Sequence, residues 1–197
     1  MSKGEQTREM IVARAAPLFN RQGYAGASMA DIMRATGLEK GGIYNHFASK
    51  NDLALAAFDY SIGLVRQRFA AALEGKRHAA ERLLAVVGVL RDMIEDPPVS
   101  GGCPLLNTAV EADDAHPELR ARARATMDDW YGMIQRIVSR GIERGELRAE
   151  TDPNEVATVL ISSLEGAIMM SKLYDDPAHV RRVAAYLSRY VAGTLRA

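Results

Sequence analysis

Residues 40–46 of this 197-residue chain gather side chains that can bind a polyanion. A cation, an aromatic hydroxyl, an amide and an imidazole can bond phosphates or base edges, with the amide suited to adenine and lysine to guanine. Each of the two glycines destabilises a helix by about 1 kcal/mol relative to alanine. This loss of stability is easier to understand if another molecule must approach the helix backbone closely. The alternative is an ordinary polar helix surface. The residues concerned are Lys40, Gly41, Gly42, Tyr44, Asn45 and His46.

Two pairs of acidic and imidazole side chains offer a different chemistry, Asp113 with His116 and Asp176 with His179. Each pair can place a carboxylate and an imidazole on one helix face, as a metal site or an acid–base pair requires. A proline follows the first pair and another lies inside the second, so both pairs fall at helix ends, where aspartate is an ordinary cap. Capping is the favoured interpretation, and no cofactor is expected.

The single cysteine, Cys103, lies between a glycine and a proline. At a helix N-terminus it would be a candidate redox or electrophile sensor, because the helix dipole activates a thiol. The favoured alternative is a small buried hydrophobic residue. One cysteine excludes an intramolecular disulfide and a cysteine zinc cluster, which is typical of a reducing compartment.

Composition indicates a folded, soluble chain, because 48% hydrophobic residues suffice for a sizeable core. A net charge of zero excludes a protein that binds nucleic acid through overall charge alone. Residues 1–52 nevertheless carry seven basic and five acidic side chains. The N-terminus lacks a signal-peptide core, and no apolar run approaches the roughly 18 residues that span a bilayer. A cytoplasmic protein without a membrane partner is therefore expected.

Three helices, the last two of them short, must position the residues at 40–46. Apolar residues at helical spacing predict a first helix from Thr7 to about Gln22, which Gly23 should stop. Pro17 inside it should kink the helix or start a new turn. An S-x-x-D arrangement predicts a second helix starting at Ser28, and Gly37 should end it. A third helix should start near residue 39. Because such short helices must dock on their neighbours, the tight turn at Gly37 predicts helix-turn-helix geometry.

The remaining chain also reads as helical, with no segment patterned as a strand. Amphipathic spacing and proline-containing breaks predict further helices over residues 51–73, 77–95 and 153–173. They also predict a short helix that begins near Pro104, a long helix that ends at Arg144, and a last helix from residue 177 onward. Asp152-Pro153 and Asp176-Pro177 each offer a cap followed by a first-turn proline. The sequence therefore predicts an all-α protein, in which a three-helix head precedes a helical bundle.

Residues 7–60 resemble the TetR-type transcriptional regulators at many positions in register. The matching segments are A-x-x-L-F-x-x-x-G-Y from Ala15 to Tyr24, S-M-x-x-I from Ser28 to Ile32, and A-x-G-L-x-K-G-x-I-Y-x-H-F-x-S-K-x-x-L from Ala35 to Leu53. A match of this length is far more specific than a lone short motif. The resemblance implies a helix-turn-helix DNA-binding domain at residues 1–50, with its recognition motif at about 28–47. It also implies a regulatory, ligand-binding and dimerisation domain at residues 51–197.

The resemblance further implies individual roles. Tyr44 and Lys50 are expected to contact phosphates, and Lys40, Gly41, Gly42, Asn45 and His46 to lie in the groove, with Ser28 also counted at the interface. Glu39 departs from the family, which often has a small capping Ser or Thr there. A pocket for an apolar or aromatic effector is expected in the bundle, because flexible methionines and amphipathic aromatic residues suit such a ligand. Its candidates are Met93, Cys103, Asn107, Met127, Trp130, Tyr131 and Met169.

The resulting hypothesis is a homodimeric, ligand-responsive regulator, with repression the favoured output, that binds a double-stranded, pseudo-palindromic DNA operator. Broad apolar faces on the last two long helices indicate the dimer interface, with a wide internal core face as the alternative. The sequence leaves two other classes open. One is an all-α metal-dependent enzyme that uses the Asp/His pairs, and the other is a helical interaction protein that does not bind DNA.

Overall fold

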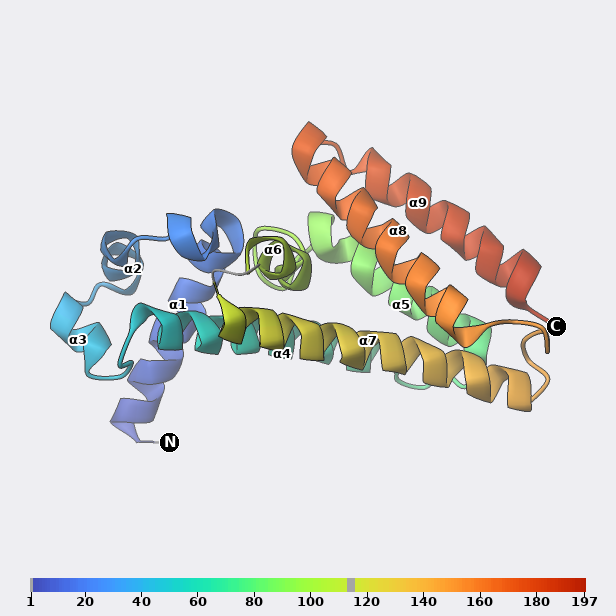
Figure 1. Ribbon diagram of the computed structural model, residues 1–197, viewed down its shortest axis with the longest axis horizontal. Coiled ribbons are helices and arrows are strands. Elements are labelled where there is room, and N and C mark those ends of the chain that lie inside the picture. Colours follow the sequence, from blue (N-terminus) through green and yellow to red (C-terminus); the bar gives the residue numbers. More distant parts are fainter. Residues whose placement is uncertain (1, 113–115) are drawn as a thin grey trace. The chain divides into compact units, whose positions relative to one another are not determined.

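The computed structural model describes residues 2–112 and 116–197, and the fold they form is helical (Figure 1). Within these residues the only β pairing is an isolated bridge between Leu147 and Arg196. The predicted all-α class is therefore confirmed. The helices are α1 (Lys3–Gly26), α2 (Met29–Thr36), α3 (Lys40–Tyr44), α4 (Lys50–Leu73), α5 (Ala79–Glu95), α6 (Pro104–Glu111), α7 (Pro117–Glu143), α8 (Pro153–Tyr174) and α9 (Ala178–Tyr190), followed by a π-helical turn at Val191–Leu195.

Two compact units make up the chain. The first contains residues up to 65 together with 98–123, and the second contains 66–97 together with 124–197. The predicted DNA-binding segment 1–50 lies wholly within the first unit, which also contains α6. The boundary proposed after residue 50 on functional grounds stays a prediction.

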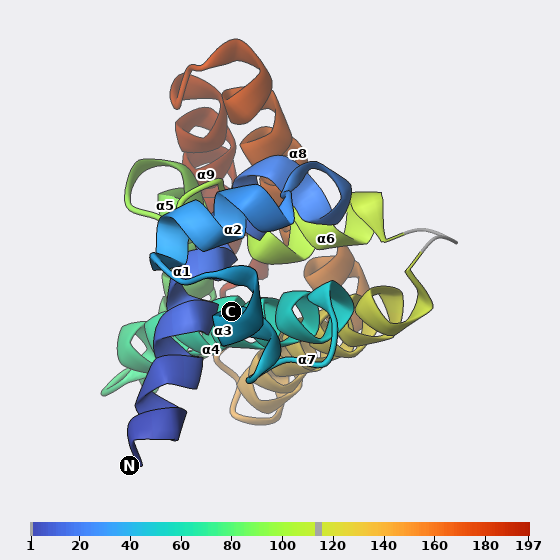
Figure 2. The same ribbon diagram turned by 90° about the vertical axis from the view of Figure 1, so that its left-hand side faces the viewer.

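The helix-turn-helix in the first unit is built on a small apolar core. α2 packs against α1 and α3 against α2 (Figure 2). Ile11 of α1, Ile32 of α2 and Ile43 of α3 meet in this core, and each is at most 1% exposed. Phe47 and Leu53 close it from the segment that follows α3. Because α3 has only five residues, this packing rather than helix propensity must hold it in place.

Local signals set the helix ends as the sequence predicts. The Ser28 hydroxyl accepts from the Asp31 backbone N–H, while the Asp31 carboxylate accepts from the Ser28 backbone N–H, which is a complete capping box. Gly37 ends α2 with φ 71°, in the left-handed region that favours glycine. In α1 the helical backbone passes through Pro17, and the non-helical residue is Gly23.

In the second unit α8 packs against α5 and α9, and α5 also packs against α9 (Figure 1). Asp152 caps α8 by accepting from the Asn154 backbone N–H at 2.8 Å, as predicted. The expectation that no apolar run approaches membrane-spanning length is wrong for α8, which contains an 18-residue window with a mean hydropathy of 1.4. Half of that window is buried inside the protein, because α8 is a core helix of its unit.

Candidate nucleic-acid interface

Six of the eight residues predicted to bind DNA lie together on α3 and the turn that follows it, whereas Ser28 caps α2 and Lys50 begins α4. Lys40, Gly41, Tyr44 and Asn45 are exposed, and His46 is half-buried. The Lys40 ammonium lies 5.8 Å from the centre of the Tyr44 ring, so a cation and a phenol share one exposed surface. This surface can donate hydrogen bonds to phosphate oxygens through lysine and tyrosine, and to base edges through asparagine.

The two glycines of α3 are not required by the fold. A Cβ added at Gly41 would have no heavy atom within 4 Å, and one added at Gly42 would meet the Leu38 Cβ at 3.6 Å, an ordinary contact. Neither glycine has positive φ. Since glycine costs about 1 kcal/mol relative to alanine inside a helix, its presence at Gly41 has no explanation within the described chain.

Glu39 is the N-cap of α3 but makes no hydrogen bond from its side chain to the helix start. The residue is exposed. A capping serine or threonine would instead accept from a free backbone N–H. The departure from the family pattern therefore leaves α3 without a side-chain cap.

Ser28 and Asp31 form a hydrogen-bonded pair at the start of α2. The Ser28 hydroxyl donates to the Asp31 carboxylate at 2.6 Å, and Arg34 forms an ion pair with the same carboxyl group. The hydroxyl and the backbone N–H of Ser28, followed by Arg34, hold the pKa of Asp31 below its ordinary value. Ser28 thus acts as a helix cap here, and its predicted contact with DNA stays a prediction.

Lys50 is directed into the first unit rather than standing free on its surface. Its ammonium donates to the backbone carbonyl of Tyr24 and lies 4.5 Å from the centre of the Tyr24 ring. Desolvation lowers the pKa of the Lys50 amine, while the Glu111 carboxylate acts in the opposite direction. In this arrangement Lys50 fixes the end of α1, so its predicted phosphate contact also stays a prediction.

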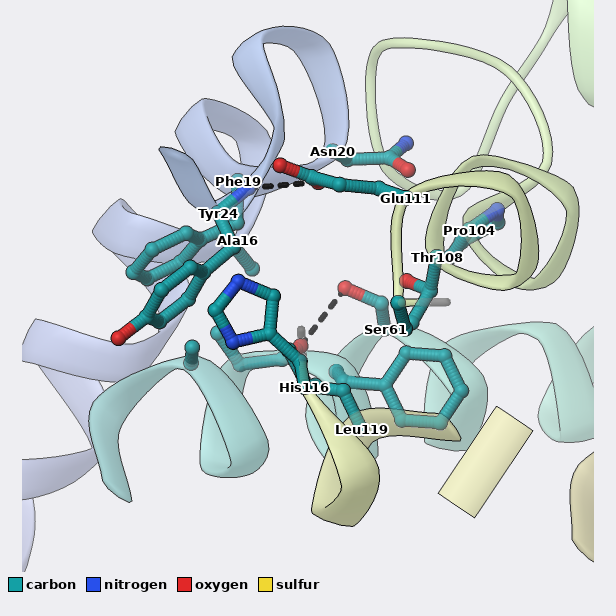
Figure 3. Close-up of a pocket in the computed structure, with 14 residues that line it drawn as sticks. Ala16, Phe19, Asn20, Tyr24, Ser61, Pro104, Thr108, Glu111, His116 and Leu119 are labelled. Carbon is teal, nitrogen blue, oxygen red and sulfur yellow. Dashed lines mark hydrogen bonds between the residues drawn. The ribbon is translucent and has the colours of Figure 1, made fainter. Parts of the chain in front are cut away.

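Glu111, the last residue of α6, also holds the end of α1 (Figure 3). Its carboxylate accepts from the backbone N–H groups of Tyr24 at 2.7 Å and of Ala25 at 2.9 Å. Gly23 interrupts the helix just before these two groups. The carboxylate therefore satisfies donors next to the kink and ties α6 to the last turn of α1, which leads into α2.

A cavity of about 30 Å³ adjoins this contact and has room for about one water molecule. Aromatic rings and polar groups from α1, α4, α6 and the start of α7 line it (Figure 3). The His116 ring meets the Tyr24 ring edge-on, with centroids 4.1 Å apart. Asp113, the other member of the predicted pair, lies outside the described residues.

Two asparagines hold the segment before α6 against α1. The Asn20 amide donates to the carbonyls of Ser100 and Gly102, both at 3.1 Å. The Asn107 amide in turn donates to the Asn20 side-chain oxygen at 2.8 Å. Asn107, predicted to be a polar handle for an effector, is engaged in fixing this segment.

The other predicted effector-binding residues are divided between the two units. Met93 and Trp130 are buried in the second unit, where the Trp130 and Phe69 rings pack edge-on at 5.3 Å. Cys103 is fully buried in the first unit. Tyr131 donates to the Asn154 carbonyl at 3.0 Å. Five of the best-formed cavities among the described residues are lined by none of the candidates. Of the two candidates not yet placed, Met127 is half-buried and Met169 is exposed.

The second Asp/His pair is divided between two local roles. Asp176 accepts from the Ala178 backbone N–H at 2.8 Å at the start of α9, which is the predicted capping role. The His179 ring packs on Tyr174 with centroids 5.2 Å apart. Across the part of the chain that the structure describes, no group of three or more His, Cys, Asp or Glu residues could hold a metal ion.

Sequence reasoning missed Glu111 and Asn20 as residues that position the head. Both act on partners more than 75 positions away, so no local spacing reports them. Gly23 was the available signal: where a glycine interrupts a helix, the backbone N–H groups of the next residues lose their helical acceptors and must find another partner.

Comparisons with known proteins cover both parts of the chain. Residues 11–57 match the family described as bacterial regulatory proteins, tetR family, and residues 79–187 match the tetracyclin repressor-like, C-terminal domain. The crystal structure of a TetR transcriptional regulator from Chloroflexus aurantiacus is 48% identical, covering 100% of this chain and 99% of its own, with a TM-score of 0.96. A TetR family regulator from Cytophaga hutchinsonii is 37% identical, covering 100% and 98%, with a TM-score of 0.89.

Among the sequence relatives, the HTH-type transcriptional repressor DhaR from Mycobacterium sp. (strain GP1) is 25% identical over 84% of this chain and 82% of its own. These findings do not support the two alternatives, an all-α enzyme and a helical protein that does not bind DNA. Members of the matched family regulate transcription and are not enzymes. The chain belongs to the TetR family of ligand-responsive, DNA-binding transcriptional regulators.

Proposed function

We propose that this regulator is a repressor whose two α3 surfaces, one from each protomer of a homodimer, bind the half-sites of a pseudo-palindromic operator. TetR-family regulators bind DNA operators and act as dimers. Half-sites on one face of the duplex would lie about 34 Å apart for each helical turn. Repression agrees with the name of the similar protein DhaR.

A small apolar or aromatic effector bound in the C-terminal part of the chain would release the DNA. It would do so by preferring a conformation in which the two heads are wrongly spaced for the operator. Linkage then requires that DNA weaken effector binding by the same factor. The effector site stays a prediction, since none of the cavities described above is lined by the residues proposed for it.

The observation that carries the proposal is Gly41. It is exposed on a helix, has ordinary helical φ, and has open space where a side chain would begin. A glycine that the fold does not require, in the middle of a surface of hydrogen-bond donors, is explained if the DNA backbone or a base edge approaches it closely.

The test compares Gly41→Ala with Gly63→Ala of α4, which also has no heavy atom within 4 Å of an added Cβ. Each variant should gain up to about 1 kcal/mol in the free energy of unfolding, because alanine favours a helix over glycine. Only Gly41→Ala should lose affinity for an operator selected from genomic DNA. Unchanged operator affinity in Gly41→Ala, measured by fluorescence anisotropy, would contradict the proposed interface.

The proposed dimer is supported by apolar side chains that α8 and α9 leave exposed. Leu173 is 73% exposed, and Tyr174 and Tyr186 are each 63% exposed. Met169 and Met170 extend the same stretch of α8. Large apolar residues exposed this close together are typical of a protein–protein interface. Sedimentation analysis of Leu173→Glu should show monomers where the parent chain forms dimers, and a dimeric variant would place the interface elsewhere.

A further inference from the structure

A groove in the second unit collects positive charge although the whole chain is neutral. The groove has a volume of about 510 Å³, within the roughly 300–1,000 Å³ typical of small-molecule sites. Five of the chain's 25 basic residues line it, and they face one acidic residue, Glu146. The five basic residues are Lys76, Arg77, Arg82, Arg140 and Arg144.

The backbone beside the groove holds two of these guanidinium groups in position. Arg82 of α5 donates to the Lys76 carbonyl at 3.2 Å, and Arg144, just beyond α7, donates to the Arg77 carbonyl at 3.5 Å. Carbonyl groups orient a guanidinium without neutralising it. Among the described residues that line the groove, one ion pair is present, between Arg144 and Glu146 at 3.9 Å. Most of the positive charge in the groove is therefore uncompensated.

The two sides of the groove are packed tightly at the base. A Cβ added at Gly141 of α7 would lie 2.5 Å from the Ala79 Cβ and 2.8 Å from a Leu147 methyl group. Ala79 and Leu147 are both buried. Close packing at this point fixes the start of α5 on α7, so the basic side chains are carried by a rigid base.

Helix electrostatics explain only one side of this arrangement. Arg140 and Arg144 lie at the C-terminal end of α7, where cations are favourable. Lys76, Arg77 and Arg82 instead surround the N-terminal end of α5, where the helix dipole is positive and cations are unfavourable. Glu146 offsets part of this by accepting from the Ala79 backbone N–H at 2.7 Å. Glu81 in the first turn does not line the groove.

We propose that this groove binds a small oligophosphate anion. Several phosphate groups in one molecule would meet cations from both sides, and arginine forks match phosphate oxygens in pairs. The bound anion would relieve the repulsion at the start of α5, so binding should stabilise the fold. This site is separate from the α3 surface, and it does not depend on the proposed operator binding.

The experiment titrates the full chain with sodium tripolyphosphate by calorimetry and follows the melting temperature. Arg77→Gln/Arg82→Gln should bind tripolyphosphate at least tenfold more weakly and lose its stabilisation on melting. Arg124→Gln/Arg148→Gln, which removes the same charge from exposed positions outside the groove, should bind like the parent chain. Sodium orthophosphate should bind at least tenfold more weakly than tripolyphosphate, and 300 mM NaCl should weaken both.

A second comparison separates the groove from the DNA-binding surface. Lys40→Ala should keep the affinity for tripolyphosphate, because α3 is not part of this site. If Arg77→Gln/Arg82→Gln and Arg124→Gln/Arg148→Gln lost equal affinity for tripolyphosphate, the proposal would be overturned. A loss in Lys40→Ala alone would do so as well. If only a non-specific 12-base-pair duplex binds the groove, its occupant is nucleic acid and the proposal is wrong.

Discussion

The Glu111 carboxylate lies so close to Gly23 that a Cβ added to Gly23 would come within 2.5 Å of it. Gly23 has φ 75° and ψ 173°, a backbone region that essentially only glycine occupies. Two independent constraints therefore apply to residue 23, one from its own backbone and one from a side chain of α6. Together they fix the end of α1, from which the chain enters the helix-turn-helix.

Gly23→Ala should destabilise the protein by about 1–3 kcal/mol, because alanine is strained in this conformation and its methyl group displaces Glu111. Urea unfolding followed by circular dichroism measures the loss. Gly26→Ala is the matched control, since its Cβ would meet only the Gln22 Cβ at an ordinary 3.6 Å. A stability equal to that of the control would show that the kink at Gly23 is not needed.

Glu111→Gln should cost about 1 kcal/mol and also weaken operator binding. A glutamine offers one oxygen in place of two, so the backbone N–H of Tyr24 or of Ala25 loses its partner. The lost contact loosens the last turn of α1, and α2 and α3 with it. Glu118→Gln, which alters an exposed carboxylate paired with Asn51, should leave operator affinity unchanged. Full operator affinity in Glu111→Gln would contradict the positioning role.

The Ser28–Asp31 cap should make stability depend on acid pH. The pKa of Asp31 is lower in the folded chain than in the unfolded one. The ionised Asp31 carboxylate therefore contributes fully to folding stability above the unfolded pKa, about 3.9. That contribution is lost as pH falls through the still lower folded pKa. Melting curves from pH 7 to pH 2.5 should therefore show Asp31→Asn less stable at neutral pH and converging with the parent chain in acid.

A companion variant checks the cause of that pH dependence. Ser28→Ala should lose about 1 kcal/mol at neutral pH, the typical value of an N-cap side chain. Because Ser28 supplies the leading hydrogen bond to Asp31, this variant should also shift the acid transition toward higher pH. A transition that does not move would assign the pH dependence to other carboxylates.

Features that depend on neighbouring residues were predictable from the sequence. The capping box at Ser28, the left-handed Gly37 and the Asp152 cap of α8 each depend on residues within three positions, and the structure confirms them. Ile43 and Phe47 are four positions apart, a spacing that favours one helix face, and both side chains lie in the same core. The helical path through Pro17 was not predicted, because tertiary packing can override a local propensity.

Features that depend on distant residues were not predictable. The roles of Glu111 and Asn20 arise from partners in another part of the chain, and a single sequence carries no sign of such pairing. The candidate effector residues were chosen by type, and methionine or tryptophan occurs in a core as readily as in a pocket. Met93 and Trp130 are buried accordingly, whereas Met169 is 54% exposed.

In the proposed dimer, the exposed apolar end of α8 would link the lifetime of this regulator to its own abundance. In the proposed dimer, Leu173 and its neighbours are covered only while a second protomer is bound. A newly made chain at low copy number would leave them open to chaperones and proteases. The amount of folded regulator would then rise more steeply than the rate of its synthesis, because the stability of such a dimer depends on protomer concentration.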